Sequence, residues 1–418
     1  MSATVRTLLA FALFAVALAI MPKIFPSGTA LTMMSLMGVA IVFALSYNML
    51  LGQTGLLSFG HAVYYGLAGF AAIHAMNWVV RNKIGVSLPF IPIVGAVAGL
   101  FFGIVFGSIS TRRAGTVFAM ISLGLGELVV AITLIMRGVF GGEEGISANR
   151  AKLEPFFGFK FGPQIEVYYL IAVWCFICVA AMYALTRTPF GRMCNAVRDN
   201  PERAEFVGYS TQRVRFIAFC LSALFAGVAG ALGAITFELV NAQALSAQQS
   251  GLVLLMSYVG GVGHFFGPII GAVLITLLQI SLSDITKAWL LYFGLMFIFV
   301  VMFWPGGIAG FIDQHRPIVR SGRFGRLLPS YSALALPVAG IALGVIGIIE
   351  LAHHQLVEAA SEGSKMKLFG IATDSATVAP WLALVALLAV AGLVFRAIWP
   401  KAAEAFATAN AAARGAAP

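Results

Sequence analysis

The chain alternates between long apolar runs and short polar segments. Apolar runs that could cross a membrane cover residues 6–22, 30–51, 61–80, 88–110, 115–138, 167–187, 214–238, 251–304, 331–351 and 379–398. A helix needs about 20 apolar residues to cross a bilayer. It also pairs its backbone polar groups internally, as the surrounding lipid requires. The pattern therefore predicts an all-α, polytopic membrane protein.

Basic residues between these runs predict the orientation of the chain. Arg112 and Arg113 separate two runs, and further arginines gather in the segments 187–215 and 316–326. Lys and Arg accumulate in cytoplasmic loops, so we expect these segments and the N-terminus in the cytoplasm. The arginines concerned are Arg187, Arg192, Arg198, Arg203, Arg213 and Arg215, and then Arg316, Arg320, Arg323 and Arg326.

The long run at 251–304 is predicted to contain a break. Four crossings must separate the two arginine-rich segments, and the runs at 214–238 and 288–304 supply two of them. Residues 251–280 must then cross twice, or enter the membrane and return. Their middle, from Gly260 to Pro268, is rich in glycine, which is typical of a helix interruption.

These counts predict two domains. Residues 1–312 would hold about ten core transmembrane helices, short and broken ones included, arranged as two inverted halves. Residues 313–418 would add an Arg-rich segment, two extra C-terminal transmembrane helices and an Ala-rich tail.

Composition supports the membrane assignment. Hydrophobic residues make up 60% of the chain and charged residues 10%, against about 25% charged in a soluble domain. The formal net charge is +10. The basic residues lie between the apolar runs, so they indicate the orientation of the chain in the membrane rather than nucleic-acid binding. Cys175 and Cys178 form C-x-x-C inside an apolar run, where packing explains them, and we expect no metal site.

Two glycine-rich interruptions are candidates for a translocation path. The residues concerned are Gly52, Gln53, Gly55, Ser58 and His61 in the first, and Gly260, Gly261 and His264 in the second. Discontinuous helices free backbone groups at membrane depth, where a solute can bind. Close packing of helices is the alternative explanation for each stretch alone.

Glu127 lies inside an apolar run. A carboxylate there costs about 2.5–3.5 kcal/mol on insertion scales, so we expect it to face the bundle interior or a wet cavity. Contact with a substrate or gate, a hydrogen bond to a neighbouring helix and protonation of the carboxylate are all open.

The segment 188–213 is predicted to be a docking site. Residues 192–207 form a short amphipathic helix in this prediction, with Gly208 as its C-cap. A basic loop that only anchors topology is the alternative. A capped surface helix suits a soluble motor protein, and the candidate coupling residues are Arg198, Asp199, Glu202, Arg203, Ala204 and Gly208.

The stretch from Glu202 to Gly208 resembles the EAA-x-x-x-G coupling motif of ABC importer permeases, with Arg203 at its second position. From about residue 30 to 312 the chain resembles LivM-type permeases for branched-chain amino acids. The stretches that carry this resemblance are GQTGLLSFGHAVYYGLAGF, ISLGLGELV, GGEEGI, TPFGRMCNAVRDNPERAEFVGYSTQRVRFIAFCLSALFAGVAGAL, YVGGVGHFFGPIIGA and FWPGGIAGFI.

This resemblance implies a subunit of an importer in the bacterial inner membrane. Its partners would be a second, LivH-like permease, two cytoplasmic ATPase subunits and a periplasmic solute-binding protein. Glu202, Ala204 and Gly208 would lie in the helix that enters the ATPase groove. Related permeases also carry urea, amides and other small solutes.

The chain is expected to bind no cofactor. No lysine follows a glycine, so the phosphate-binding G-K-[ST] motif is lacking, and ATP would be hydrolysed by partner subunits. An ion-coupled secondary carrier is the competing hypothesis, with Glu127 as its intramembrane charge. A membrane enzyme has no support from a catalytic motif.

Overall fold

The computed structural model describes residues 3–304, 306–322 and 324–414. Arg323 and the last four residues of the Ala-rich tail lie outside the described residues. Contacts divide the chain into two compact units. Unit 1 comprises Met1–Leu282 and Met296–Gly310, and unit 2 comprises Ser283–Leu295 and Phe311–Pro418. The predicted boundary after residue 312 stays a prediction.

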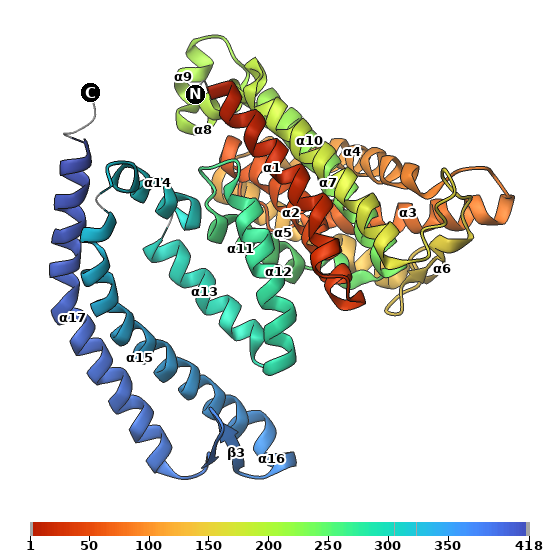
Figure 1. Ribbon diagram of the computed structural model, residues 1–418. Coiled ribbons are helices and arrows are strands. Elements are labelled where there is room, and N and C mark those ends of the chain that lie inside the picture. The colour runs from red at the N-terminus through yellow and green to blue at the C-terminus, as the bar shows by residue number, and fades with distance from the viewer. Residues whose placement is uncertain (1–2, 305, 323, 415–418) are drawn as a thin grey trace. The chain divides into compact units, whose positions relative to one another are not determined.

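Helices dominate the chain up to residue 285 (Figure 1). The long ones are α1 (Ala3–Ile24), α2 (Gly28–Thr54), α3 (Ala62–Asn82), α4 (Ile91–Ser110), α5 (Gly115–Ile135), α7 (Gln164–Arg187), α10 (Thr211–Phe237), α11 (Ala247–Gly260) and α12 (Gly267–Ile285). Shorter pieces are α6 (Arg137–Phe140), α8 (Pro189–Asp199), α9 (Pro201–Phe206), η1 (Leu88–Phe90), η2 (Arg150–Lys152) and η3 (Ala242–Leu245). Strand β1 (Ile146–Ser147) pairs antiparallel with β2 (Leu239–Val240), with Ile146 opposite Val240.

The remaining elements follow residue 285. They are α13 (Trp289–Phe303), α14 (Gly307–Arg320), η4 (Phe324–Arg326), α15 (Leu328–His353), the π-helix η5 (His354–Glu358), α16 (Ala359–Glu362), β3 (Lys365–Leu368), β4 (Ile371–Asp374) and α17 (Val378–Arg414). Within unit 2, α15 and α17 lie side by side (Figure 1). Tyr292 donates a hydrogen bond to Glu350 of α15 at 2.7 Å. This contact provides an internal partner for a carboxylate within an apolar helix.

In the described part of the chain, 10 helices are long and apolar enough to cross a membrane, or up to 11 if a bent pair counts as one span. The prediction of an all-α polytopic membrane protein is confirmed, and the arrangement in two inverted halves stays a prediction. The predicted break after Gly260 is also confirmed, because α11 ends there and α12 begins at Gly267. At 14 residues, α11 is only about 21 Å long, which is shorter than a ~30 Å hydrocarbon core.

Unit 1 is held together by close helix packing. Gly95, Gly99, Gly103 and Gly107 recur every fourth residue along α4 and are all buried. A Cβ at Gly99 would lie 2.3 Å from the carbonyl oxygen of Ala223 in α10. Small residues at this spacing let two helix backbones approach closely, which is the usual way that helices associate in lipid.

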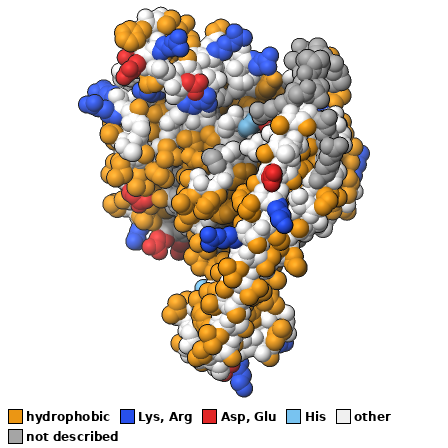
Figure 2. Space-filling model, turned by 90° about the vertical axis from the view of Figure 1, so that its left-hand side faces the viewer, with side chains coloured by type: hydrophobic (Ala, Val, Ile, Leu, Met, Phe, Trp, Pro, Cys, Tyr) orange, Lys and Arg blue, Asp and Glu red, His pale blue; other side chains and the backbone are white. Residues whose placement is uncertain are grey.

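Other faces of the helices present large apolar side chains to the surroundings. Leu8 is 64% exposed, Val97 62% and Met120 70%. Figure 2 shows hydrophobic side chains over much of the visible face, with few charged groups among them. Exposed apolar area on this scale marks a membrane or protein contact surface, so the chain is a multi-pass membrane protein.

Candidate coupling segment and translocation path

The segment between α7 and α10 forms two short helices, α8 and α9. Thr188 caps α8 by accepting a hydrogen bond from the Gly191 N–H at 3.3 Å, and Asn200 caps α9 by accepting one from the Arg203 N–H at 2.9 Å. The residue before a proline is disfavoured in a helix, and Asn200, before Pro201, is extended with φ of −154°. Our prediction of a single helix over 192–207 is therefore wrong.

Gly208 ends α9, as predicted. Its φ is +93°, a conformation that suits glycine. The Gly208 N–H donates to the Glu205 carbonyl at 2.8 Å, and the Tyr209 N–H donates to the Ala204 carbonyl at 3.1 Å. This pair of hydrogen bonds is the Schellman motif, which satisfies two carbonyls at the end of the helix.

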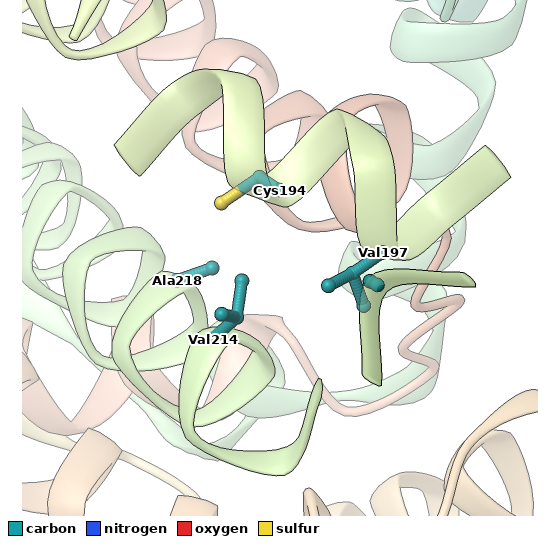
Figure 3. Close-up of a cluster of buried hydrophobic side chains, with 5 residues drawn as sticks. Cys194, Val197, Val214 and Ala218 are labelled. Atoms are coloured by element: carbon teal, nitrogen blue, oxygen red, sulfur yellow. The ribbon is translucent and has the colours of Figure 1, made fainter. Parts of the chain in front are cut away.

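We call α8 and α9, together with the residues up to Tyr209, the coupling segment. One face of it packs against α10 through an apolar cluster. Cys194 and Val197 of α8 lie toward Val214 and Ala218 of α10 (Figure 3). Ala204 of α9 completes the cluster. Burial raises the pKa of the Cys194 thiol to about 12, so this cysteine is a packing residue and not a reactive one.

The opposite face of the segment is exposed. Glu202 and Arg203 are both exposed, which leaves their charges available to a partner. Phe206 is 91% exposed, Val207 72% and Tyr209 44%. We call these three residues the apolar tip. None of the three is among the predicted coupling residues. Phe206 and Val207 lie beside the capping glycine and on a different face of α9 from the buried Ala204, which is a usable signal in the sequence.

The first glycine-rich interruption is the connection between α2 and α3. Gly55 ends α2 with φ of +71°, and the loop runs to His61. Side chains from neighbouring helices satisfy its backbone: the Phe59 N–H donates to Ser122 of α5 and the Ala62 N–H to Ser250 of α11, both at 3.0 Å. The loop is therefore held in place from two sides.

Buried polar groups gather around this loop. His61 is 1% exposed, and its Nε2 lies 3.1 Å from the Ser46 hydroxyl. Asn48 and Ser58 are 3% and 1% exposed. Among the described residues, Asn48 Oδ1, Ser58 Oγ and His61 Nδ1 have no hydrogen-bond partner. Buried polar atoms of this kind are normally satisfied by a water or a ligand.

The two predicted interruptions meet in the structure. A Cβ at Gly52 would lie 2.6 Å from the main-chain oxygen of Val262, in the second interruption. Gly260 and Gly261 are buried there, and His264 is half-buried. Of the other candidates in the first interruption, Gln53 is half-buried and Gly55 is exposed.

Glu127 follows Gly126, which packs against Gly60 of the first interruption, but its own side chain is not part of the buried polar cluster. It is exposed on α5, so the expectation that it faces the interior of this bundle is wrong. A wet cavity outside this chain, and a place in the path, stay predictions for this residue.

In the described part of the chain, no group of three or more His, Cys, Asp or Glu side chains is placed to hold a metal ion.

Interrupted apolar helices at membrane depth are typical of membrane transport proteins. The chain belongs to the family described as the permease component of the branched-chain amino acid transport system, which it matches over residues 29–303. The resemblance to LivM-type permeases is thereby confirmed.

The known relatives of the chain are also transport permeases. The high-affinity branched-chain amino acid permease LivM of Escherichia coli is 27% identical over 320 residues, covering 71% of this chain and 74% of the relative. LivM of Salmonella typhimurium is 28% identical over 289 residues, covering 64% and 67%. The fructose import permease FrcC of Rhizobium meliloti is 27% identical over 229 residues, covering 50% and 61%. No solved structure matches the chain.

Proposed function

We propose that this chain is the permease subunit of an ABC importer for branched-chain or other small amino acids in the bacterial inner membrane. A second, LivH-like permease, two cytoplasmic ATPase subunits and a periplasmic solute-binding protein complete the assembly. One observation carries the proposal. The coupling segment is packed against α10 on one face and exposes a charged and apolar surface on the other.

The coupling segment and the N-terminus lie in the cytoplasm in this proposal. The arginines of the segments 187–215 and 316–326 support that orientation. The ATPase subunits supply the energy, and their closure moves α8 and α9. The connection at Gly52–His61 and the break after Gly260 then shift, and the path opens toward the cytoplasm.

The substrate is proposed from the few polar groups near the two interruptions. Asn48, Ser58 and His61 offer buried polar atoms without a described partner, which suits a small solute with a few hydrogen-bonding groups. The similarity to LivM proteins favours a branched-chain amino acid. The chain is also similar to a fructose permease, so the identity of the transported solute should be determined first.

Uptake of radiolabelled leucine by cells with and without this gene tests the proposal. Valine, urea and glutamate serve as unlabelled competitors, and ATP is depleted in a parallel sample. We expect the deletion to remove an ATP-dependent uptake that valine inhibits. Unchanged leucine uptake in cells without a redundant system would reject branched-chain amino acids, and urea and amides would be tested next. Uptake that persists after ATP depletion but needs an ion gradient would support the secondary carrier instead.

Replacing Gly208 by valine should reduce uptake without affecting membrane insertion. A β-branched residue is disfavoured at positive φ, and the strain of about 1–2 kcal/mol would loosen the end of α9. This energy corresponds to a decrease of roughly fivefold to thirtyfold in the affinity of the coupling segment for the ATPase subunits. A side chain at Gly208 meets nothing within 4 Å, so no clash accompanies the strain.

Gly208→Asn is the matched control, because asparagine tolerates the left-handed conformation. It should retain most of the uptake at equal amounts of protein in the membrane. Equal uptake by the valine and wild-type proteins would remove the capped helix from the coupling role.

A further inference from the structure

Arg198 connects the coupling segment to the end of α2. It lies in the last turn of α8, and its guanidinium donates a hydrogen bond to the main-chain carbonyl of Gly52. The stem of the side chain lies against Gly55, where an added Cβ would be 3.2 Å from the Arg198 Cγ. The side chain is 36% exposed, so it is partly enclosed by these contacts.

The Gly52 carbonyl is one of the last four of α2, and such carbonyls have no partner within their own helix. The neighbouring Leu51 carbonyl accepts from the Gly55 N–H at 3.0 Å. Arg198 supplies the partner for Gly52 from outside the helix. A positive charge is also stabilising at the negative end of a helix dipole.

Gly52 in turn touches the second interruption. Its Cα faces the main-chain oxygen of Val262, with no room for a Cβ between them. A displacement of Arg198 therefore acts on a residue of the first interruption that directly contacts the second. Arg198, Gly52 and Val262 come from three segments that are far apart in the sequence.

We propose that Arg198 is the positioning residue that transmits movement of the docked coupling segment to the two helix interruptions. This inference rests on the proposed function, and it names the side chain through which the coupling segment acts. Arg198 is not needed to hold α8 in place, because the apolar cluster around Cys194 and Val197 does so. Its other bond, to the exposed Asp199 at 2.8 Å, is a surface ion pair, which contributes little to stability.

The test uses the complete importer in proteoliposomes, with leucine or the solute found in the uptake assay. Arg198→Ala removes the link, and Arg198→Lys keeps the positive charge and a hydrogen-bond donor but loses the planar guanidinium. Arg112→Ala is the matched control, since the exposed Arg112 donates to the Ser108 carbonyl at 2.9 Å near the end of its own helix, α4. The quantities measured are solute uptake and ATP hydrolysed per solute.

We expect Arg198→Ala to lower uptake by about tenfold, as for the loss of a charged hydrogen bond, and to raise the ATP hydrolysed per solute. A merely structural defect would lower uptake and hydrolysis together and leave their ratio unchanged. Arg198→Lys should recover part of the coupling, and Arg112→Ala should behave as wild type.

Two results would overturn the inference, and they are distinguishable. A wild-type ratio of ATP to solute in Arg198→Ala, in an importer that shows ATP-dependent uptake, would reject the role of Arg198 and leave the proposed function intact. An assembly that shows no ATP-dependent uptake of any tested solute would reject the proposed function and this inference with it.

Discussion

Replacing Phe206 by alanine should weaken binding of the ATPase subunits by about thirtyfold, which corresponds to about 2 kcal/mol. An aromatic side chain that enters a partner's pocket commonly contributes that much to an interface. Phe206 is 91% exposed at the end of α9 and lies beside the exposed Val207. The measurement is the affinity of the purified ATPase subunits for the detergent-solubilised permease.

The control for this variant is Phe157→Ala. Phe157 is 87% exposed in the segment between α5 and α7, which the proposed orientation places on the outer side of the membrane. Both variants remove one exposed aromatic ring, so neither should change the folding of the isolated chain. If the two variants bind the ATPase subunits equally well, the apolar tip does not dock.

Features set by local chemistry were predictable from the sequence. The end of α9 follows from Gly208, because a helix commonly ends at a glycine in the left-handed conformation. The break after Gly260 follows from its glycines together with the charge bias of the flanking loops. The division of the coupling segment at Asn200 is also readable in the sequence, since Asn-Pro is a turn signal that prevails over the amphipathic periodicity of 192–207.

The exposure of individual side chains was harder to predict. Glu127 was expected to be covered because a bare carboxylate in lipid is costly. That cost predicts that other protein groups shield the carboxylate from lipid, but it does not say whether this chain or a partner provides them. In the structure, Glu127 is exposed on α5. Similarly, periodicity indicates which face of α9 is buried but not how far Phe206 projects.

Contacts between distant segments were not predictable. The glycines at positions 52 and 260 each indicated a break, yet nothing in either stretch indicates that Gly52 touches Val262. The same holds for the hydrogen bond from Arg198 to Gly52. These contacts depend on how α2, α8 and α11 pack, which a single sequence does not encode in any local pattern.

The contact between the two interruptions leaves no space for a side chain at Gly52. Replacing Gly52 by alanine should reduce uptake by about fivefold to 150-fold, because overpacking a close contact costs about 1–3 kcal/mol. The added Cβ would lie 2.6 Å from the Val262 main-chain oxygen and 2.3 Å from Asn48 Oδ1. The asparagine side chain can move aside, whereas the Val262 carbonyl is part of the backbone, so the second interruption itself must shift.

Gly263→Ala is the matched control, since it adds the same methyl group to the second interruption at a position where nothing lies within 4 Å. Uptake and the amount of protein in the membrane are measured for both variants. Loss of uptake by Gly52→Ala alone, at equal protein, would mean that transport depends on the close approach of the two interruptions. Equal uptake by both variants would mean that transport does not depend on the close approach of Gly52 to Val262.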